Sequence, residues 1–241
     1  WPTGLGFEHF YGFIGAETDQ WRPAAFEGTR PIEPYLANPD YNFDYDMADQ
    51  AIKWVRNQKA VAPDKPFFLY YAPGATHSPH HPKKEWIAKY KGKFDRGWDK
   101  VREETLARQK KLGIVPADTR LTKRHAELPA WDSLSTEQKQ LFAYMMEVYA
   151  GYLSQTDYNV GRVLDAVERM GQLDNTLVIY ICGDNGASVE GNIGGSFNEI
   201  ASLNGIPESL KQMLERKDDL GTWKTHNHSP VAWAHAMNAP F

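Results

Sequence analysis

Two polar stretches follow apolar runs in this sequence, and both could do chemistry. Asp184 and Asn185 come after the run at 176–182 and stand between two glycines. Their carboxylate and amide oxygens are the ligands that Ca²⁺ or Mg²⁺ prefers, whereas Zn²⁺ favours nitrogen and sulfur. Both residue types are also common in turns, because their side chains bond to nearby backbone groups. The pair alone therefore leaves a metal site and a turn as open interpretations.

The second polar stretch is rich in histidine and proline and follows the aromatic run at 67–71. It contains His77, His80 and His81, of which His77 lies closest to the end of the run. A histidine held in a cleft there could donate to an anion or protonate a leaving group. A surface loop with incidental histidines is the competing interpretation. A zinc site would need cysteine or glutamate partners at usual spacings, and these are missing.

Other candidate residues favour structural roles. His226 and His228 could form a metal pair, but a loop is the simpler interpretation. Cys182 lies inside the apolar run, so we expect a buried structural thiol and not a nucleophile. The sequence contains no G-x-G-x-x-G, P-loop or G-x-S-x-G motif.

Helical periodicity indicates the elements that must position these residues. Apolar residues at three- to four-residue steps predict a long helix that begins at Ser135, which forms a capping box with Gln138. Gly171 fits the position just past its end, and Gly151 or Gly161 could break it. Further helices are predicted at 46–57, with Asp44 or Asp46 as a cap, at two or three places in 84–133, and at 207–217.

The two apolar runs, 67–71 and 176–182, have the composition of buried strands. Their alternation with helices predicts an α/β fold with a mostly parallel sheet. Ligands of such sheets bind beyond the carboxyl ends of the strands. We therefore expect His77 to face the same cleft as Asp184 and Asn185, within about 5–8 Å, the space that an anion and a metal would share.

Bulk properties narrow the class of protein. The chain has 241 residues, 41% of them hydrophobic, and a net charge of −4, which gives no electrostatic reason to expect a nucleic-acid partner. No apolar run approaches the ~20 residues of a membrane span. The chain starts at Trp1 without a leader and ends in an apolar stretch at Phe241. We expect an internal part of a longer protein.

Several segments, in this order and spacing, resemble the sulfatase family, specifically the bacterial arylsulfatase-like branch within the alkaline phosphatase superfamily. The matching segments cover nearly the whole chain: GFEHFYGF at 6–13, the run and loop with THSPHHP at 67–82, the helix at 151–171, YICGDNG at 180–186 and PVAWAHAMNAPF at 230–241. The resemblance implies an α/β alkaline-phosphatase-like sandwich, with a mostly parallel central sheet flanked by helices. Residues 1–241 would be a partial catalytic domain, with the N-terminal nucleophile segment and the C-terminal part outside it.

The resemblance also implies roles for particular residues. Asp184 and Asn185 match the Asp-Asn pair that holds a divalent cation, usually Ca²⁺, and His77 matches the histidine that contacts the sulfate ester on its leaving-group side. The family's nucleophile is a formylglycine made within a C/S-x-P-x-R motif, which does not occur in these 241 residues. For this chain alone we therefore expect no sulfatase turnover and only weak calcium binding.

The implied activity is hydrolysis of a sulfate monoester, on a small molecule or a glycan, to an alcohol or phenol plus sulfate. Two alternatives stay open at this point. One is a phosphate or phosphonate monoester hydrolase of the same superfamily, and the other is a non-catalytic relative that binds sulfate esters or glycans. The sequence does not distinguish bacterial cytoplasm from periplasm.

Overall fold

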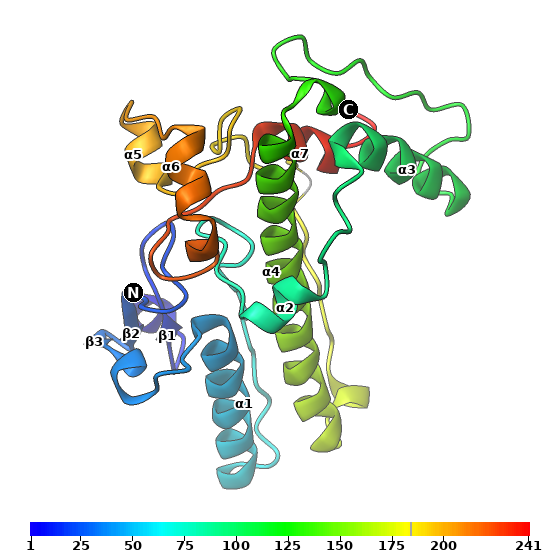
Figure 1. Ribbon diagram of the computed structural model, residues 1–241. Coiled ribbons are helices and arrows are strands. Elements are labelled where there is room, and N and C mark those ends of the chain that lie inside the picture. The colour runs from blue at the N-terminus through cyan, green and yellow to red at the C-terminus, as the bar shows by residue number, and fades with distance from the viewer. Residues whose placement is uncertain (184) are drawn as a thin grey trace.

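The computed structural model describes residues 1–183 and 185–241, which form seven α-helices, five short 3₁₀ helices and one small sheet. The helices are α1 (Phe43–Val61), α2 (Lys84–Ala88), α3 (Gly97–Lys111), α4 (Thr136–Arg169), α5 (Glu199–Leu203), α6 (Leu210–Glu215) and α7 (Val231–Met237) (Figure 1). The 3₁₀ helices are η1 (Pro2–Leu5), η2 (Pro34–Ala37), η3 (Trp131–Ser133), η4 (Leu173–Asn175) and η5 (Lys217–Asp219). The strands are β1 (Tyr11–Gly12), β2 (Ala25–Glu27) and β3 (Arg30–Ile32).

The long helix α4 forms as predicted, and α1 and α2 pack against it. Ser135 and Gln138 make both bonds of the capping box, and Gly171 follows the helix with a left-handed φ of 66°. The predicted break at Gly151 or Gly161 is wrong, because α4 is continuous through both. A Cβ at Gly151 would lie 2.9 Å from the backbone of α2, so glycine serves there for close helix approach.

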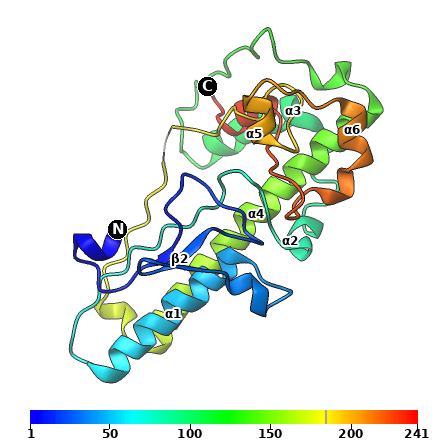
Figure 2. The ribbon, with the colours of Figure 1, turned by 90° about the vertical axis from the view of Figure 1, so that its left-hand side faces the viewer.

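Helix α1 contains the predicted 46–57 segment and packs along α4 (Figures 1 and 2). The residue before its first turn is Asn42; Asp44 and Asp46, expected as caps, lie within that turn. Asp44 is buried and accepts bonds from Gln155 Nε2 at 3.0 Å and Asn159 Nδ2 at 2.8 Å, both on α4. Burial raises the pKa of the Asp44 carboxyl above its usual range. The two helices are thus joined through a buried polar contact.

The main core lies between α4, α3 and α7. Trp98, Trp131 and Trp233 pack edge-to-face or tilted against one another, with Leu141 and Phe142 of α4 in the same cluster. The helices expected in 84–133 are confirmed as α2 and α3, and the one expected at 207–217 as α6. Helices α5 and α7 were not predicted, because they are only five and seven residues long and so carry little helical periodicity.

The strand predictions at 67–71 and 176–182 are wrong for this structure. Both segments are extended, yet neither pairs with a strand among residues 1–183 and 185–241. Leu177 is 85% exposed and Ile181 83%, and Cys182, expected to be buried, is exposed as well. The sheet that does form is antiparallel, in the order β1-β2-β3. An apolar run becomes a buried strand only where neighbouring strands satisfy its backbone, and no strand in the described part of the chain does so here.

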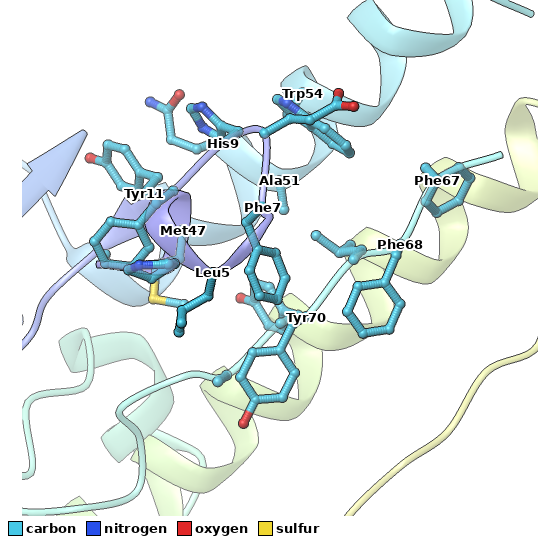
Figure 3. A pocket seen from close by; sticks show the side chains of 18 of the residues that line it. Leu5, Phe7, His9, Tyr11, Met47, Ala51, Trp54, Phe67, Phe68 and Tyr70 are labelled. Atoms are coloured by element: carbon cyan, nitrogen blue, oxygen red, sulfur yellow. The ribbon is translucent and has the colours of Figure 1, made fainter. Parts of the chain in front are cut away.

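Residues 67–71 line one side of a groove of about 940 Å³. It is open and rich in aromatic side chains, and it lies between the N-terminal segment, α1 and residues 65–72. Figure 3 shows Phe7, Phe68 and Tyr70 at the groove, with Trp54 on the α1 side. The residues that line the groove include neither His77 nor Asn185, so the groove is separate from these two predicted site residues. Among the described helices, none combines the length and apolar character needed to cross a membrane.

Candidate active site

His77 lies in the loop between the extended segment 67–71 and α2. Its Nδ1 is 2.9 Å from the Ser78 carbonyl oxygen and 3.3 Å from Glu17 Oε2. Both neighbours are acceptors, so Nδ1 carries the proton, and Nε2 is the nitrogen without a hydrogen-bond partner among residues 1–183 and 185–241. The side chain is 58% exposed, so it is oriented by its partners but open to solvent. A fixed tautomer with a free Nε2 is what a proton-transferring histidine needs.

The other two histidines of this loop have a structural role. His81 is fully buried, and its Nε2 donates to the Thr225 carbonyl at 2.7 Å. Its own carbonyl accepts from Asn42 Nδ2 at 3.1 Å, next to α1. The backbone N–H of His80 donates to the Asn227 carbonyl at 3.3 Å. These bonds tie the loop to the 225–228 segment and so hold His77 in place.

His80 is a buried imidazole whose Nδ1 has no hydrogen-bond partner within the described part of the chain. Its ring lies 5.1 Å from the rings of Tyr149 and His228, centroid to centroid. Burial lowers the pKa of His80 well below its usual range, and the neighbouring His228 lowers it further. His80 is therefore neutral in the folded protein.

Glu17 connects two histidines that are distant in the sequence. Its Oε2 is 3.3 Å from His77 Nδ1, and its Oε1 is 2.8 Å from His226 Nε2. The Glu17 side chain is 23% exposed, so these two contacts are partly shielded from water. Sequence reasoning did not single out Glu17, because nothing local distinguishes it from a surface glutamate.

The predicted metal ligands are only partly described. Asp184 lies outside the described residues. Asn185 is exposed and follows the extended segment 176–183. A Cβ at Gly183 would come within 2.8 Å of Asn185 Oδ1, so glycine leaves room for this amide oxygen beside the backbone. An amide oxygen such as Asn185 Oδ1 is a ligand that a hard cation prefers. That Asn185 lies close to His77 stays a prediction.

Two groups of carboxylates and histidines could hold a metal ion. The first consists of Glu17, Glu199 and His226, and the second of Glu190, Glu199 and His228; within each group the ligand atoms lie within 4.8 Å of one another. Neither group was predicted, since their members come from segments far apart in the sequence. The simple loop interpretation of 226–228 was therefore incomplete: His228 is buried and pairs with Ser196 through the backbone.

The sequence of the chain also matches a known protein family. The family model described as Sulfatase matches residues 2–239, nearly the whole chain. The chain belongs to the sulfatase family. This confirms the resemblance inferred from the sequence, and with it the α/β, alkaline-phosphatase-like class of fold. The sheet among the described residues is the small antiparallel one, β1-β2-β3.

Curated relatives agree with the sulfatase assignment. The chain is 30% identical over 250 residues to the arylsulfatase of Klebsiella aerogenes and 31% identical over 263 residues to the uncharacterized sulfatase PB10D8.02c of Schizosaccharomyces pombe. All of this chain is covered in both cases, against 51% and 44% of the relatives, so the chain spans about half their length. The crystal structure of Ps i-CgsB has 19% identity and a TM-score of 0.44, over 73% of this chain and 32% of that one. A similarity of this size carries no argument about substrate.

Proposed function

We propose that the complete gene product is a sulfuric ester hydrolase, in which this chain supplies one side of the active site. The reaction is hydrolysis of a sulfate monoester, of an alcohol, a phenol or a glycan hydroxyl, to the free hydroxyl and sulfate. The observation that carries the proposal is the pairing of His77 with Glu17, at 3.3 Å, in a chain of the sulfatase family.

His77 is the proton donor to the leaving group. Its Nδ1–H is directed to the Ser78 carbonyl and the Glu17 carboxylate, so Nε2 faces the substrate. When Nε2 is protonated, it can donate to the ester oxygen as the S–O bond breaks, which stabilises the departing alkoxide or phenoxide. The Glu17 carboxylate lies beside Nδ1 and so helps to keep the imidazole in this orientation.

Asp184 and Asn185 would hold a divalent cation, and Ca²⁺ suits their oxygen donors best. When bound, such a cation supplies positive charge that neutralises sulfate oxygens and stabilises charge developing on them. Gly183, which precedes the pair, leaves room for the Asn185 amide oxygen close to the backbone. The nucleophile of the proposed reaction is a formylglycine in a C/S-x-P-x-R motif, a motif that these 241 residues do not contain.

The proposed activity is tested on the complete gene product with matched chromogenic aryl sulfate and aryl phosphate esters. We expect calcium-dependent release of sulfate and much slower release of phosphate. Faster phosphate release would favour the phosphomonoesterase alternative. Binding of a sulfated glycan without turnover of either ester would favour the non-catalytic alternative.

A further inference from the structure

A compact group of side chains that could hold a metal ion lies next to His77, and Glu17 is the only member used in the proposed hydrolysis. It joins Glu17 from the N-terminal loop, Glu199 at the start of α5 and His226 from the segment before α7, with ligand atoms within 4.8 Å of one another. Glu17 Oε1 already lies 2.8 Å from His226 Nε2. Two ligands of one Zn²⁺, each bound at about 2.0–2.2 Å, lie roughly 3.0–3.5 Å apart. Only a small adjustment would bring these atoms into one coordination shell.

Glu199 is the observation that points to a ligand. The residue is only 3% exposed, and its Oε2 is buried with no hydrogen-bond partner among residues 1–183 and 185–241. A buried carboxylate without a donor or a counter-charge is strongly unfavourable, and in proteins such groups are paired or bind metals. A second carboxylate, Glu17, lies nearby and adds like-charge repulsion. A cation between the two would relieve both costs.

Backbone hydrogen bonds fix two of the three ligands in place. The Glu199 N–H donates to the His226 carbonyl at 2.8 Å, and the His226 N–H donates to the Phe197 carbonyl at 2.8 Å. The Glu208 carboxylate accepts from the N–H of Phe197 at 2.7 Å and from that of Asn198 at 2.9 Å. These contacts hold the segments of Glu199 and His226 side by side, so a cation would find a largely preorganised site.

We propose that Glu17, Glu199 and His226 bind a divalent transition-metal cation of the Zn²⁺ type. One imidazole nitrogen and two carboxylates suit Zn²⁺, whereas Ca²⁺ and Mg²⁺ prefer shells made of oxygen alone. This difference in preferred metal distinguishes the proposed site from the all-oxygen Asp184-Asn185 pair. The two carboxylates carry the formal charge that a divalent cation neutralises.

The neighbouring group with Glu190 and His228 shares Glu199 and is the weaker site. Glu190 is exposed, so its carboxylate is well hydrated and mobile before any metal binds. The Glu17 and His226 side chains expose only 23% and 28% of their surface. The better-shielded group is therefore assigned as the binding site.

The proposal is tested by titrating Zn²⁺ into chelator-treated protein by calorimetry, with Ca²⁺ in excess to fill any all-oxygen site. We expect one Zn²⁺ per chain, with an affinity reduced more than about tenfold in each of Glu17→Gln, Glu199→Gln and His226→Asn, since each removes one ligand. Glu190→Gln and the surface control Glu215→Gln should bind Zn²⁺ as the unchanged protein does. X-ray absorption at the zinc edge should show one imidazole and oxygen ligands.

Absence of Zn²⁺ binding would overturn the proposal, as would an affinity that Glu190→Gln lowers and Glu17→Gln leaves unchanged. Circular dichroism of each variant separates lost ligation from lost folding. The inference does not rest on the proposed hydrolysis, so ester turnover and Zn²⁺ binding can fail independently.

Discussion

Residues 72–83, the loop that contains His77, His80 and His81, and the extended segment 177–181 reverse the usual burial of polar and apolar side chains. In the loop, the polar residues His80 and His81 are 2% and 0% exposed, whereas Leu177 and Ile181 are 85% and 83% exposed. The loop makes backbone and side-chain hydrogen bonds to segment 225–228, whereas the extended segment has no strand partner within the described residues. The difference shows that burial here follows the availability of backbone partners as much as the polarity of side chains.

The same contrast separates the long helix from the extended segment. Helix α4 satisfies its backbone internally and buries one face, with Leu141 fully buried. The extended segment can satisfy its backbone only through another strand. The region that folds through local hydrogen bonds is therefore the stable one, and mutations should affect the two regions very differently.

The sharpest test of this contrast is one substitution made in both regions. Leu141→Ala should lower the free energy of unfolding by about 2–5 kcal/mol, because it leaves a cavity in the core. Leu177→Ala should change it by less than about 0.5 kcal/mol, because the side chain is already in water. Urea denaturation followed by circular dichroism measures both. Equal losses at the two positions would break the comparison.

Two glycines within α4 give a second test, of how closely α2 packs on this helix. Gly151→Ala should destabilise the protein by about 1–2 kcal/mol, because the new methyl group would overlap the backbone of α2. Gly161→Ala is the matched control: a Cβ there meets nothing within 4 Å. The control should stabilise the protein by up to about 1 kcal/mol, since alanine favours the helix. Stabilisation by both changes would show that α2 does not pack on α4 as described.

The buried histidine predicts a smaller, pH-dependent effect. Folding lowers the pKa of His80, so the unfolded chain binds a proton below about pH 6.5 that the folded protein does not bind. The free energy of unfolding should therefore fall as the pH drops below about 6.5, by at most about 1.4 kcal/mol per pH unit. His80→Phe should flatten this dependence, and His125→Phe, at an exposed histidine, should not. The tyrosines and His228 that face His80 remain in both variants.

Local signals made the long helices α1 and α4 predictable from sequence. The Ser135–Gln138 capping box and Gly171 lie within a few residues of the helix ends that they define, and both were identified correctly. The break predicted at Gly151 was wrong, because the reason for that glycine is α2, a partner more than sixty residues away. The family was also recognisable, because its motifs are local stretches in a fixed order.

Features that depend on distant partners were not predictable. An apolar run such as 176–182 has the same sequence whether or not neighbouring strands cover it, so its exposure could not be inferred. Glu17, Glu199 and His226 come together only in the fold, and no spacing rule connects them. His77 could be proposed because it follows an apolar run directly, but its partner Glu17 could not.

The most direct test of the central claim, that His77 protonates the leaving group, is the dependence of kcat on leaving-group pKa. It is measured with a series of sulfate esters on the complete gene product and its His77→Ala variant. For alcohols and poorly acidic phenols, loss of His77 should lower kcat by about 100-fold or more. For strongly acidic nitrophenols the loss should be small, because such groups leave without a proton, and His125→Ala should match the unchanged protein throughout. A loss of the same size for every leaving group, or no loss at all, would contradict the account.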